Sequence, residues 1–296
     1  MLRVLLQRLQ GAVCAEAAAD RPLARTVPGA DDDARRTTLE ISKQLCAVTD
    51  IGRTRDHNED LVHVSDDGRV MILADGMGGH AAGEVASALA VAAITEHLHA
   101  ALGSPIDPSS DAPTSAMRAA MDAAQQRVLA AAASPEGKPG MGCTLVLACI
   151  RDDVLHTCHV GDVRAYLWRE GEFGTLTRDH SVVAEMVATG VLTPDQARGH
   201  PAKNEVLRAI GMPAGFEPDS QRCALQPGDR VILCSDGLWE MLSDRDIARV
   251  VGADGSMRQL ATQLIDRAND AGGHDNVSVV LYQHCVPLQS TGAQSG

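Results

Sequence analysis

Very short connections between successive strand-like runs most constrain the fold of this chain. Residues 144–151, 154–160 and 164–169 are rich in β-branched and other apolar residues, and little more than the pairs Asp152-Asp153 and Gly161-Asp162 separates them. A parallel pair of strands needs a crossover of about a dozen residues or more. These three neighbours must therefore run antiparallel.

Helices are grouped away from the strands in the predicted order of elements. Further strands are expected at 45–49, 60–64, 70–74, 231–234 and 276–283, and helices at 82–102, 115–133, 182–190, 193–198, 244–251 and 257–269. The turn at 66–68 joins two of these strands as a hairpin. Strands that adjoin one another while helices lie elsewhere indicate an α+β fold of antiparallel sheets covered by helices. A Rossmann or P-loop enzyme is therefore disfavoured.

The charge of the chain excludes several classes of partner. Asp and Glu number 39 against 26 Lys and Arg, which gives a formal charge of −13 at pH 7. Nucleic-acid binding needs a basic surface for the phosphate backbone, and binding to anionic membranes needs one as well. Aromatic residues make up 2% of the chain, too few for stacking on single strands. We expect neither nucleic acid nor a membrane surface as a partner.

Cysteine usage and hydropathy predict the compartment. The eight cysteines include no CxxC pair, and most lie in apolar runs, where a thiol behaves as a small buried hydrophobe. A disulfide scaffold is not expected in a chain of this length with this core composition. No stretch approaches ~18 uninterrupted apolar residues, so no membrane span is expected. These features predict a soluble, cytoplasmic protein with reduced thiols.

Three segments are expected along the chain. Residues 1–43 lack the period of a helix or a strand and are predicted to be a flexible N-terminal extension, with a small docking helix as the alternative. Residues 44–285 form one folded domain, and residues 286–296 are a polar C-terminal tail.

Acidic residues stand next to the ends of the predicted strands. They are Asp75-Gly76, Asp236-Gly237, Asp275-Asn276, Gly161-Asp162 and Asn58-Glu59-Asp60. One Asp-Gly pair is ordinarily a turn, as at 66–68. A carboxylate at a buried strand end is unfavourable unless it is paired or coordinated, and several together form a hard oxygen site for Mg²⁺ or Mn²⁺. Glycine lets a backbone carbonyl approach the metal as well. This pattern predicts an acidic divalent-metal site but no substrate.

Seven motifs extend this pattern in a fixed order. They are DIGRTRDHNED at 50–60, ADGMGGHAAGEVAS at 74–87, GCT at 142–144, HVGDVRAY at 159–166, LTRDHS at 176–181, SDGLWE at 235–240 and GGHDN at 272–276. With them the chain closely resembles the metal-dependent serine/threonine phosphatases of the protein phosphatase 2C family, in their bacterial form. The resemblance runs from about residue 45 to 284. It implies a four-layer αββα sandwich of two antiparallel sheets flanked by helices, and it makes 44–285 the catalytic domain.

The resemblance also implies a role for each site residue, around two Mn²⁺ or Mg²⁺ ions. Asp75 would bridge both metals, with the Gly76 carbonyl, Asp236 and Asp275 completing the first and Asp60, with Glu59 close by, the second. Asp162 matches the aspartate that, with Asp236, can hold a third, weaker metal, and Arg55 matches the arginine that grips the phosphate. His80 is either the general acid for the leaving oxygen or a helix-start residue that contacts substrate or loop. Residues 181–212 match the variable flap beside the active site, which either shapes substrate choice or has no catalytic role.

The implied function is hydrolysis of phosphoserine and phosphothreonine in proteins by metal-activated water, reversing a Ser/Thr protein kinase. Its partners would be phosphorylated proteins, including such a kinase or its substrates, and the protein would be a monomer. Two rivals stay open: a binding or regulatory module that has lost turnover, and a two-metal phosphoesterase that acts on small molecules. The intact Asp60, Asp75, Asp236 and Asp275 argue against the first. A phosphatase of the cysteine class is disfavoured, although Cys158 and Arg164 have the Cys-x5-Arg spacing of that class, because metal-activated water needs no cysteine nucleophile.

Overall fold

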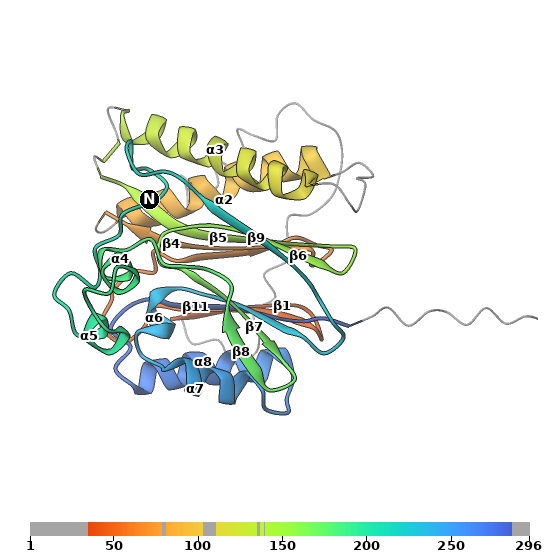
Figure 1. Cartoon of the computed structure of the whole chain (residues 1–296). Coiled ribbons are helices and arrows are strands. Elements are labelled where there is room, and N and C mark those ends of the chain that lie inside the picture. The colour runs from red at the N-terminus through yellow and green to blue at the C-terminus, as the bar shows by residue number, and fades with distance from the viewer. Residues whose placement is uncertain (1–34, 79–80, 103–110, 135–136, 139, 286–296) are drawn as a thin grey trace, which may run out of the picture.

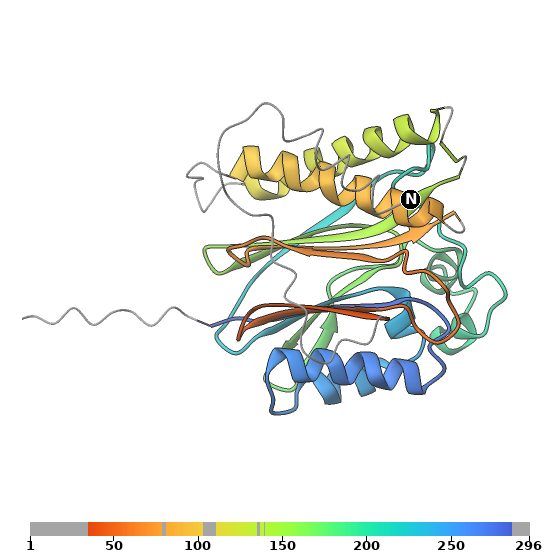
Figure 2. The ribbon, with the colours of Figure 1, turned by 180° about the vertical axis from the view of Figure 1, so that it is seen from behind.

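The computed structural model describes residues 35–78, 81–102, 111–134, 137–138 and 140–285. The C-terminal tail, the first 34 residues of the predicted extension and His80 lie outside the described residues. Two sheets stack face to face between two layers of helices (Figures 1 and 2).

The first sheet has six strands, and every pair of neighbours is antiparallel. Its order is β1 (Arg36–Ser42), β2 (Leu45–Asp50), β11 (Val277–Gln283), β10 (Arg230–Cys234), β7 (Arg164–Arg169) and β8 (Glu172–Thr175). The second sheet is antiparallel throughout as well, in the order β3 (Leu61–Val64), β4 (Val70–Met77), β5 (Gly142–Arg151), β6 (Val154–Val160) and β9 (Asp219–Ala224).

Helices cover the outer face of each sheet, as Figure 1 shows. Helices α2 (Ala81–Leu102) and α3 (Ala112–Ala132) pack on the second sheet, and α7 (Asp244–Val251) and α8 (Met257–Asp270) pack on the first. At one end of the sandwich lie α4 (Val182–Ala188), α5 (Pro194–Arg198) and α6 (Asp236–Trp239). The four-layer α+β sandwich predicted from the sequence is confirmed.

The predicted antiparallel pairing of residues 154–160 with 164–169 is wrong: β6 pairs with β5 and β9 in the second sheet, and β7 pairs with β10 and β8 in the first. The short connection at Gly161-Asp162 carries the chain from one sheet to the other instead of closing a hairpin.

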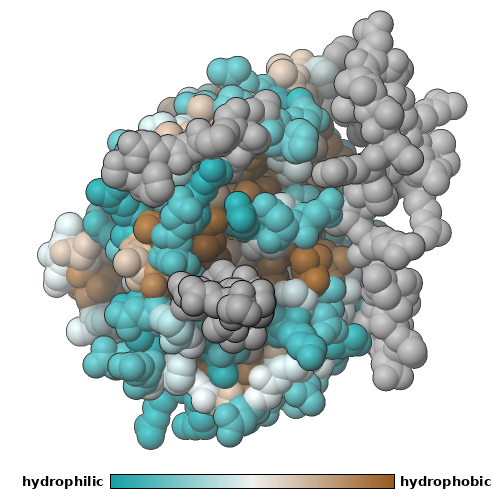
Figure 3. All heavy atoms as spheres, turned by 90° about the vertical axis from the view of Figure 1, so that its right-hand side faces the viewer, coloured by the Kyte–Doolittle hydropathy of each residue, from teal (hydrophilic) through white to brown (hydrophobic). Residues whose placement is uncertain are grey.

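Both faces of the central strands are buried, because a strand points successive side chains to opposite sides. In β4, Met71 and Leu73 enter the core between the sheets, and Ile72 and Ala74 enter the core under α2 and α3. The end of the molecule opposite α4 and α5 shows hydrophilic side chains around recessed apolar ones (Figure 3). In the described part of the chain, no helix combines the length and apolarity needed to cross a membrane.

One predicted boundary is wrong. Residues 36–42 were expected in the extension that ends at 43, but they form β1, which pairs with β2 from Arg36 opposite Asp50 onward. The structure also contains β8 and β9, which the sequence pattern does not predict. All three are edge strands, where backbone hydrogen bonds to a single neighbour suffice and side chains stay partly exposed. Little apolar alternation therefore marks them.

Candidate metal centre

Asp75 lies in β4 where the strand leaves the core. It is opposite Thr144 of β5 in the antiparallel register, and Gly76 follows it. A Cβ atom on Gly76 would lie 2.5 Å from the Gly83 carbonyl oxygen and 2.6 Å from that of Glu59. Only glycine permits so close an approach, so Gly76 keeps the end of β4 against the start of α2 and the chain before β3.

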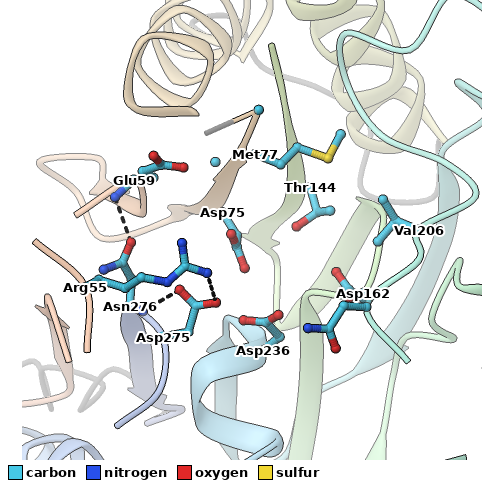
Figure 4. Close-up of a pocket in the computed structure, with 13 residues that line it drawn as sticks. Arg55, Glu59, Asp75, Met77, Thr144, Asp162, Val206, Asp236, Asp275 and Asn276 are labelled. Atoms are coloured by element: carbon cyan, nitrogen blue, oxygen red, sulfur yellow. Dashed lines mark hydrogen bonds and ion pairs between the residues drawn. The ribbon is translucent and has the colours of Figure 1, made fainter. Parts of the chain in front are cut away.

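Three further aspartates reach the same cavity from separate connections. Asp162 lies in the turn between β6 and β7, Asp236 begins α6 directly after β10, and Asp275 directly precedes Asn276 and β11. With Asp75 they line a cavity of about 230 Å³. In Figure 4 the carboxylates of Asp75, Asp236 and Asp275 point toward one another. Strand order and tight turns thus gather residues that are up to 200 positions apart (275 − 75).

Burial and mutual repulsion oppose the charged forms of these carboxylates. Desolvation raises the pKa of Asp75 well above its usual value, and the charges of Asp236, Asp60 and Asp162 raise it further. Desolvation and the neighbouring Asp162 and Asp275 likewise raise the pKa of Asp236. Such an acidic cavity favours protons or bound cations over free carboxylates.

Asp60 and Glu59 lie at this site in different ways. Asp60 is buried, is not among the residues that line the cavity, and accepts a hydrogen bond from Ser235 Oγ at 2.8 Å. Its burial raises its pKa to about 7. Glu59 does line the cavity, but its carboxylate lies against Gly83 at the start of α2. Figure 4 shows this carboxylate turned away from Asp75.

Arg55 brings a positive charge to the edge of the cavity. Its Nη2 atom donates to Asp275 Oδ2 at 2.7 Å, and the Arg55 side chain is 51% exposed. The arginine predicted to grip phosphate is therefore at the site, where it is paired with one of the predicted metal ligands.

Asn276 organises the loop that carries Arg55, a role that the sequence reading missed. Its Nδ2 atom donates to the carbonyl oxygens of Ile51 and His57, on either side of Arg55, at 2.9 Å each. Its Oδ1 atom accepts from the Glu59 backbone N–H at 2.8 Å. The Asp-Asn pair before β11 predicted a metal site in the sequence. The groups that the Asn276 amide binds come from distant segments and depend on the fold.

The flap also contributes to the cavity wall. Asn204 and Val206 line the cavity, and the neighbouring Lys203 forms a 2.7 Å ion pair with Glu240, just after α6. The sequence placed the flap beside the active site without indicating which of its residues reach it.

The donor set fits a hard divalent cation. Oxygen atoms dominate the acidic side of the cavity, and the buried Thr144 Oγ1 atom has no hydrogen-bond partner in the described part of the chain. Mg²⁺ and Mn²⁺ prefer carboxylate, carbonyl and water oxygens. Among residues 35–285 as far as they are described, no three His, Cys, Asp or Glu side chains already form a closed metal cage. The carboxylates share the cavity without enclosing one point.

Comparison with known proteins identifies the family. The family model described as "Protein phosphatase 2C" matches residues 52–281, which include every predicted ligand around the cavity. The chain belongs to the protein phosphatase 2C family. This membership confirms the resemblance stated from the motifs, together with the predicted fold and enzyme class.

Two similar proteins come from bacteria. This phosphatase is 37% identical over 241 residues to "Protein phosphatase PhpP" of Streptococcus pneumoniae, covering 80% of this chain and 96% of the relative. It is 34% identical over 241 residues to "Serine/threonine phosphatase stp" of Listeria welshimeri, covering 79% of this chain and 93% of the relative.

Solved structures agree with the fold. The Mycobacterium tuberculosis serine/threonine phosphatase PstP/Ppp superposes with a TM-score of 0.74 at 35% identity, covering 82% of this phosphatase and 99% of that chain. The catalytic domain of PstP in complex with two manganese ions gives a TM-score of 0.72 at 34% identity, covering 82% and 98%.

Proposed function

We propose that this phosphatase removes phosphate from phosphoserine and phosphothreonine in proteins with the help of two Mn²⁺ or Mg²⁺ ions. The observation that carries the proposal is the convergence of Asp75, Asp162, Asp236 and Asp275, from four separate connections, on one cavity with Arg55 at its edge. The relatives named as serine/threonine phosphatases support the substrate class, and the two manganese ions bound by PstP support the cofactor.

The carboxylates divide between two metals in this proposal. Asp75 would contribute to both sites, the Gly76 carbonyl, Asp236 and Asp275 to the first, and Asp60, with Glu59 close by, to the second. Asp162 and Asp236 would hold a third ion more weakly. Bound cations supply an activated water and offset the charge on the phosphoryl oxygens. Because the carboxylates are buried and repel one another, cation binding also relieves an unfavourable charge state of the protein.

Arg55 binds the phosphate group in this proposal. A guanidinium offers two parallel N–H donors to a phosphate, and the half-exposed side chain of Arg55 is within reach of incoming substrate. In the metal-free protein Arg55 binds Asp275, which is one of the proposed metal ligands. Pairing with Asp275 therefore competes with phosphate binding by Arg55 and with metal binding by Asp275.

Further parts of the proposal concern the leaving group and the setting. His80 protonates the leaving serine or threonine oxygen. The phosphatase acts as a cytoplasmic monomer on phosphorylated proteins, and it reverses a Ser/Thr kinase by acting on that kinase or on its substrates. The relatives named as serine/threonine phosphatases support action on phosphorylated proteins, and the cysteines without a CxxC pair support a reducing compartment.

The test is phosphate release from a phosphothreonine peptide in Mn²⁺ buffer, with p-nitrophenyl phosphate as a small-molecule comparison. Asp75→Ala and Asp236→Ala should lose release, and EDTA should abolish it for the wild type. Asp254→Ala, an exposed carboxylate between α7 and α8, is the matched control and should behave as wild type. Turnover of the small ester alone would favour the small-molecule rival. No turnover of either substrate would favour the binding module.

A further inference from the structure

His180 lies at the base of the flap, residues 181–212. It is 6% exposed and directly precedes the N-cap residue of α4. The two ends of the flap meet beside it, because Ser181 forms a β-bridge with Val206 and the Leu207 N–H donates to the His180 carbonyl oxygen at 2.7 Å. His180 therefore belongs both to the sandwich and to the flap.

The same histidine satisfies both backbone polar groups of Gly161. The His180 N–H donates to the Gly161 carbonyl oxygen at 2.9 Å, and the Gly161 N–H donates to His180 Nδ1 at 3.2 Å. Gly161 has a φ of +100°, and a Cβ atom there would lie 2.3 Å from the Thr144 side chain. The peptide is thus held in a conformation open to glycine alone, and the next residue is Asp162.

The hydrogen bonds fix the tautomer and the plane of the imidazole. Because a backbone N–H can only donate, Nδ1 must accept, and Nε2 carries the proton and faces Asp219 Oδ2 at 3.2 Å. The His159 ring stacks on one face of the imidazole, with the ring centroids 4.7 Å apart. The imidazole has little freedom to turn away from Gly161.

A second side chain holds the same turn through Asp162. Trp239, the last residue of α6, donates its indole N–H to the Asp162 carbonyl oxygen at 3.0 Å. The Arg164 guanidinium lies 3.8 Å from the centroid of the Trp239 ring and binds Asp179 through two hydrogen bonds of 3.0 and 2.7 Å. Asp179 directly precedes His180, so the two supports are themselves connected.

We propose that His180 and Trp239 are positioning residues that fix the Gly161–Asp162 turn, the first through Gly161 and the second through Asp162, and that His180 thereby ties the Asp162 carboxylate to the base of the flap. The inference rests on the proposed function, because it assigns Asp162 to the weakest of the metal sites. Groups that orient a metal ligand typically change metal affinity about 10- to 100-fold when they are altered.

The test is Mn²⁺ binding to the full chain by titration calorimetry. His180→Gln places its amide near the Nε2 position and loses the acceptor for Gly161, whereas His180→Asn keeps an oxygen near the Nδ1 position. His180→Gln should lower the Mn²⁺ affinity of the weakest site about 10-fold or more, and His180→Asn should keep most of the wild-type affinity. The matched control is His200→Gln, since His200 Nδ1 accepts a backbone N–H from Ala202 within the flap at 3.1 Å without touching Gly161.

A double-mutant cycle shows whether the effect acts through Asp162. In an Asp162→Asn background, His180→Gln should cause no further loss of Mn²⁺ binding. The inference would be overturned if His180→Gln weakened Mn²⁺ binding just as much in the Asp162→Asn background. It would also be overturned if His180→Gln alone bound Mn²⁺ like the wild type, or if His180→Asn lost as much affinity as His180→Gln. Trp239→Phe, which removes the indole donor but keeps a ring under Arg164, should weaken the same site and gives the answer if His180→Gln does not fold. Unchanged Mn²⁺ binding by Trp239→Phe would also overturn it.

Wild-type phosphate release separates this inference from the proposed function. A wild type that binds Mn²⁺ but releases no phosphate from the peptide would reject the proposed function. The calorimetric comparison of the His180 variants would still decide whether the histidine positions Asp162.

Discussion

Asp75 carries a charge that is unfavourable in the folded protein unless a cation binds beside it. Its carboxylate is desolvated, and four other aspartates raise its pKa: Asp236, Asp60, Asp162 and Asp275. A buried charge without a compensating partner destabilises a fold. The charged Asp75 carboxylate destabilises the metal-free protein, and a bound cation would offset that cost.

Replacing Asp75 should separate stability from activity. Asp75→Asn should raise the melting temperature of the EDTA-treated protein at pH 8, because a repelled, desolvated charge is removed. The same variant should release phosphate at least about 100-fold more slowly, since metal ions contribute several kcal/mol to such reactions. Calorimetric melting and a phosphate assay check the two halves, with Asp254→Asn as the control. A lower melting temperature for metal-free Asp75→Asn would contradict the account of its charge.

Arg55 can be tested against a neighbouring arginine in the same loop. Arg55→Ala should raise KM for a phosphothreonine peptide about 10- to 100-fold, because a charged hydrogen bond to substrate contributes about 1.5–3 kcal/mol. Arg55→Lys should recover part of the loss, since lysine keeps the charge without the planar pair of donors. Arg53→Ala is the matched control: Arg53 is 48% exposed and does not line the cavity. Equal effects of the two alanine variants would argue against a specific phosphate contact by Arg55.

At the scale of elements, two loops pack together to form one side of the cavity. Gly52 has a φ of +86°, and a Cβ atom there would lie 2.1 Å from the Asp275 carbonyl oxygen. Arg53 and Thr54 both donate their backbone N–H groups to the Gly273 carbonyl oxygen, at 2.7 and 3.2 Å. The loop that carries Arg55 is thus held against the loop that carries Asp275.

Gly52→Ala should therefore disturb both the loop packing and the activity. A left-handed conformation alone costs about 1–2 kcal/mol for a residue with a Cβ atom, as it would in Gly171→Ala, where φ is +91° and no atom lies within 4 Å. Gly52→Ala should lose more stability than Gly171→Ala and should also lose phosphate release. Urea unfolding of the two variants gives the comparison. If both lose the same stability and both stay active, the close packing of these loops has no functional consequence.

The sequence allowed central elements to be predicted better than peripheral ones. Strands with apolar side chains on both faces, such as β4 with Ile72 and Leu73, carry a strong signal, and they also position Asp75. Edge strands such as β1 show little apolar pattern in the sequence, since their stability comes from backbone pairing with one neighbour. The Asp-Gly and Asp-Asn pairs likewise indicated the acidic cavity. The hydrogen-bond partners of Asn276 and His180 could not be predicted from the sequence, because these bonds join segments that meet only in the folded chain.

At the scale of the whole molecule, acidic residues at the site make stability depend on pH and metal. Burial raises the pKa of both Asp60 and Asp162 to about 7, from a value of 3.8. Carboxyls whose pKa is raised in the folded state stabilise it fully below about pH 4, and that contribution is lost as the pH rises through about 7. The opposite holds for Asp229: burial opposes its charge, but its hydrogen-bonded ion pair with Arg169 keeps its pKa lowered, so its contribution to stability is lost in acid.

The metal-free phosphatase should therefore be more stable at about pH 5 than at pH 8, with the loss developing as the pH rises through about 7. Saturating Mn²⁺ should remove this loss, because bound cations favour the charged carboxylates. Melting temperatures measured from pH 4 to 8 with EDTA or Mn²⁺ check the expectation. A metal-free protein whose stability rises steadily from pH 5 to 8 would show that the buried carboxyls are not destabilised by ionisation.

The central claim, that these carboxylates bind the cations on which phosphate release depends, can be tested in a single titration. Mn²⁺ bound per chain and phosphate released from a phosphothreonine peptide are measured in the same EDTA-treated sample as Mn²⁺ is added. The account predicts no release without metal, a rise that is complete when about two ions are bound, and loss of both binding and release in Asp236→Ala. Undiminished release by the metal-free protein, or full Mn²⁺ binding and release by Asp236→Ala, would contradict it.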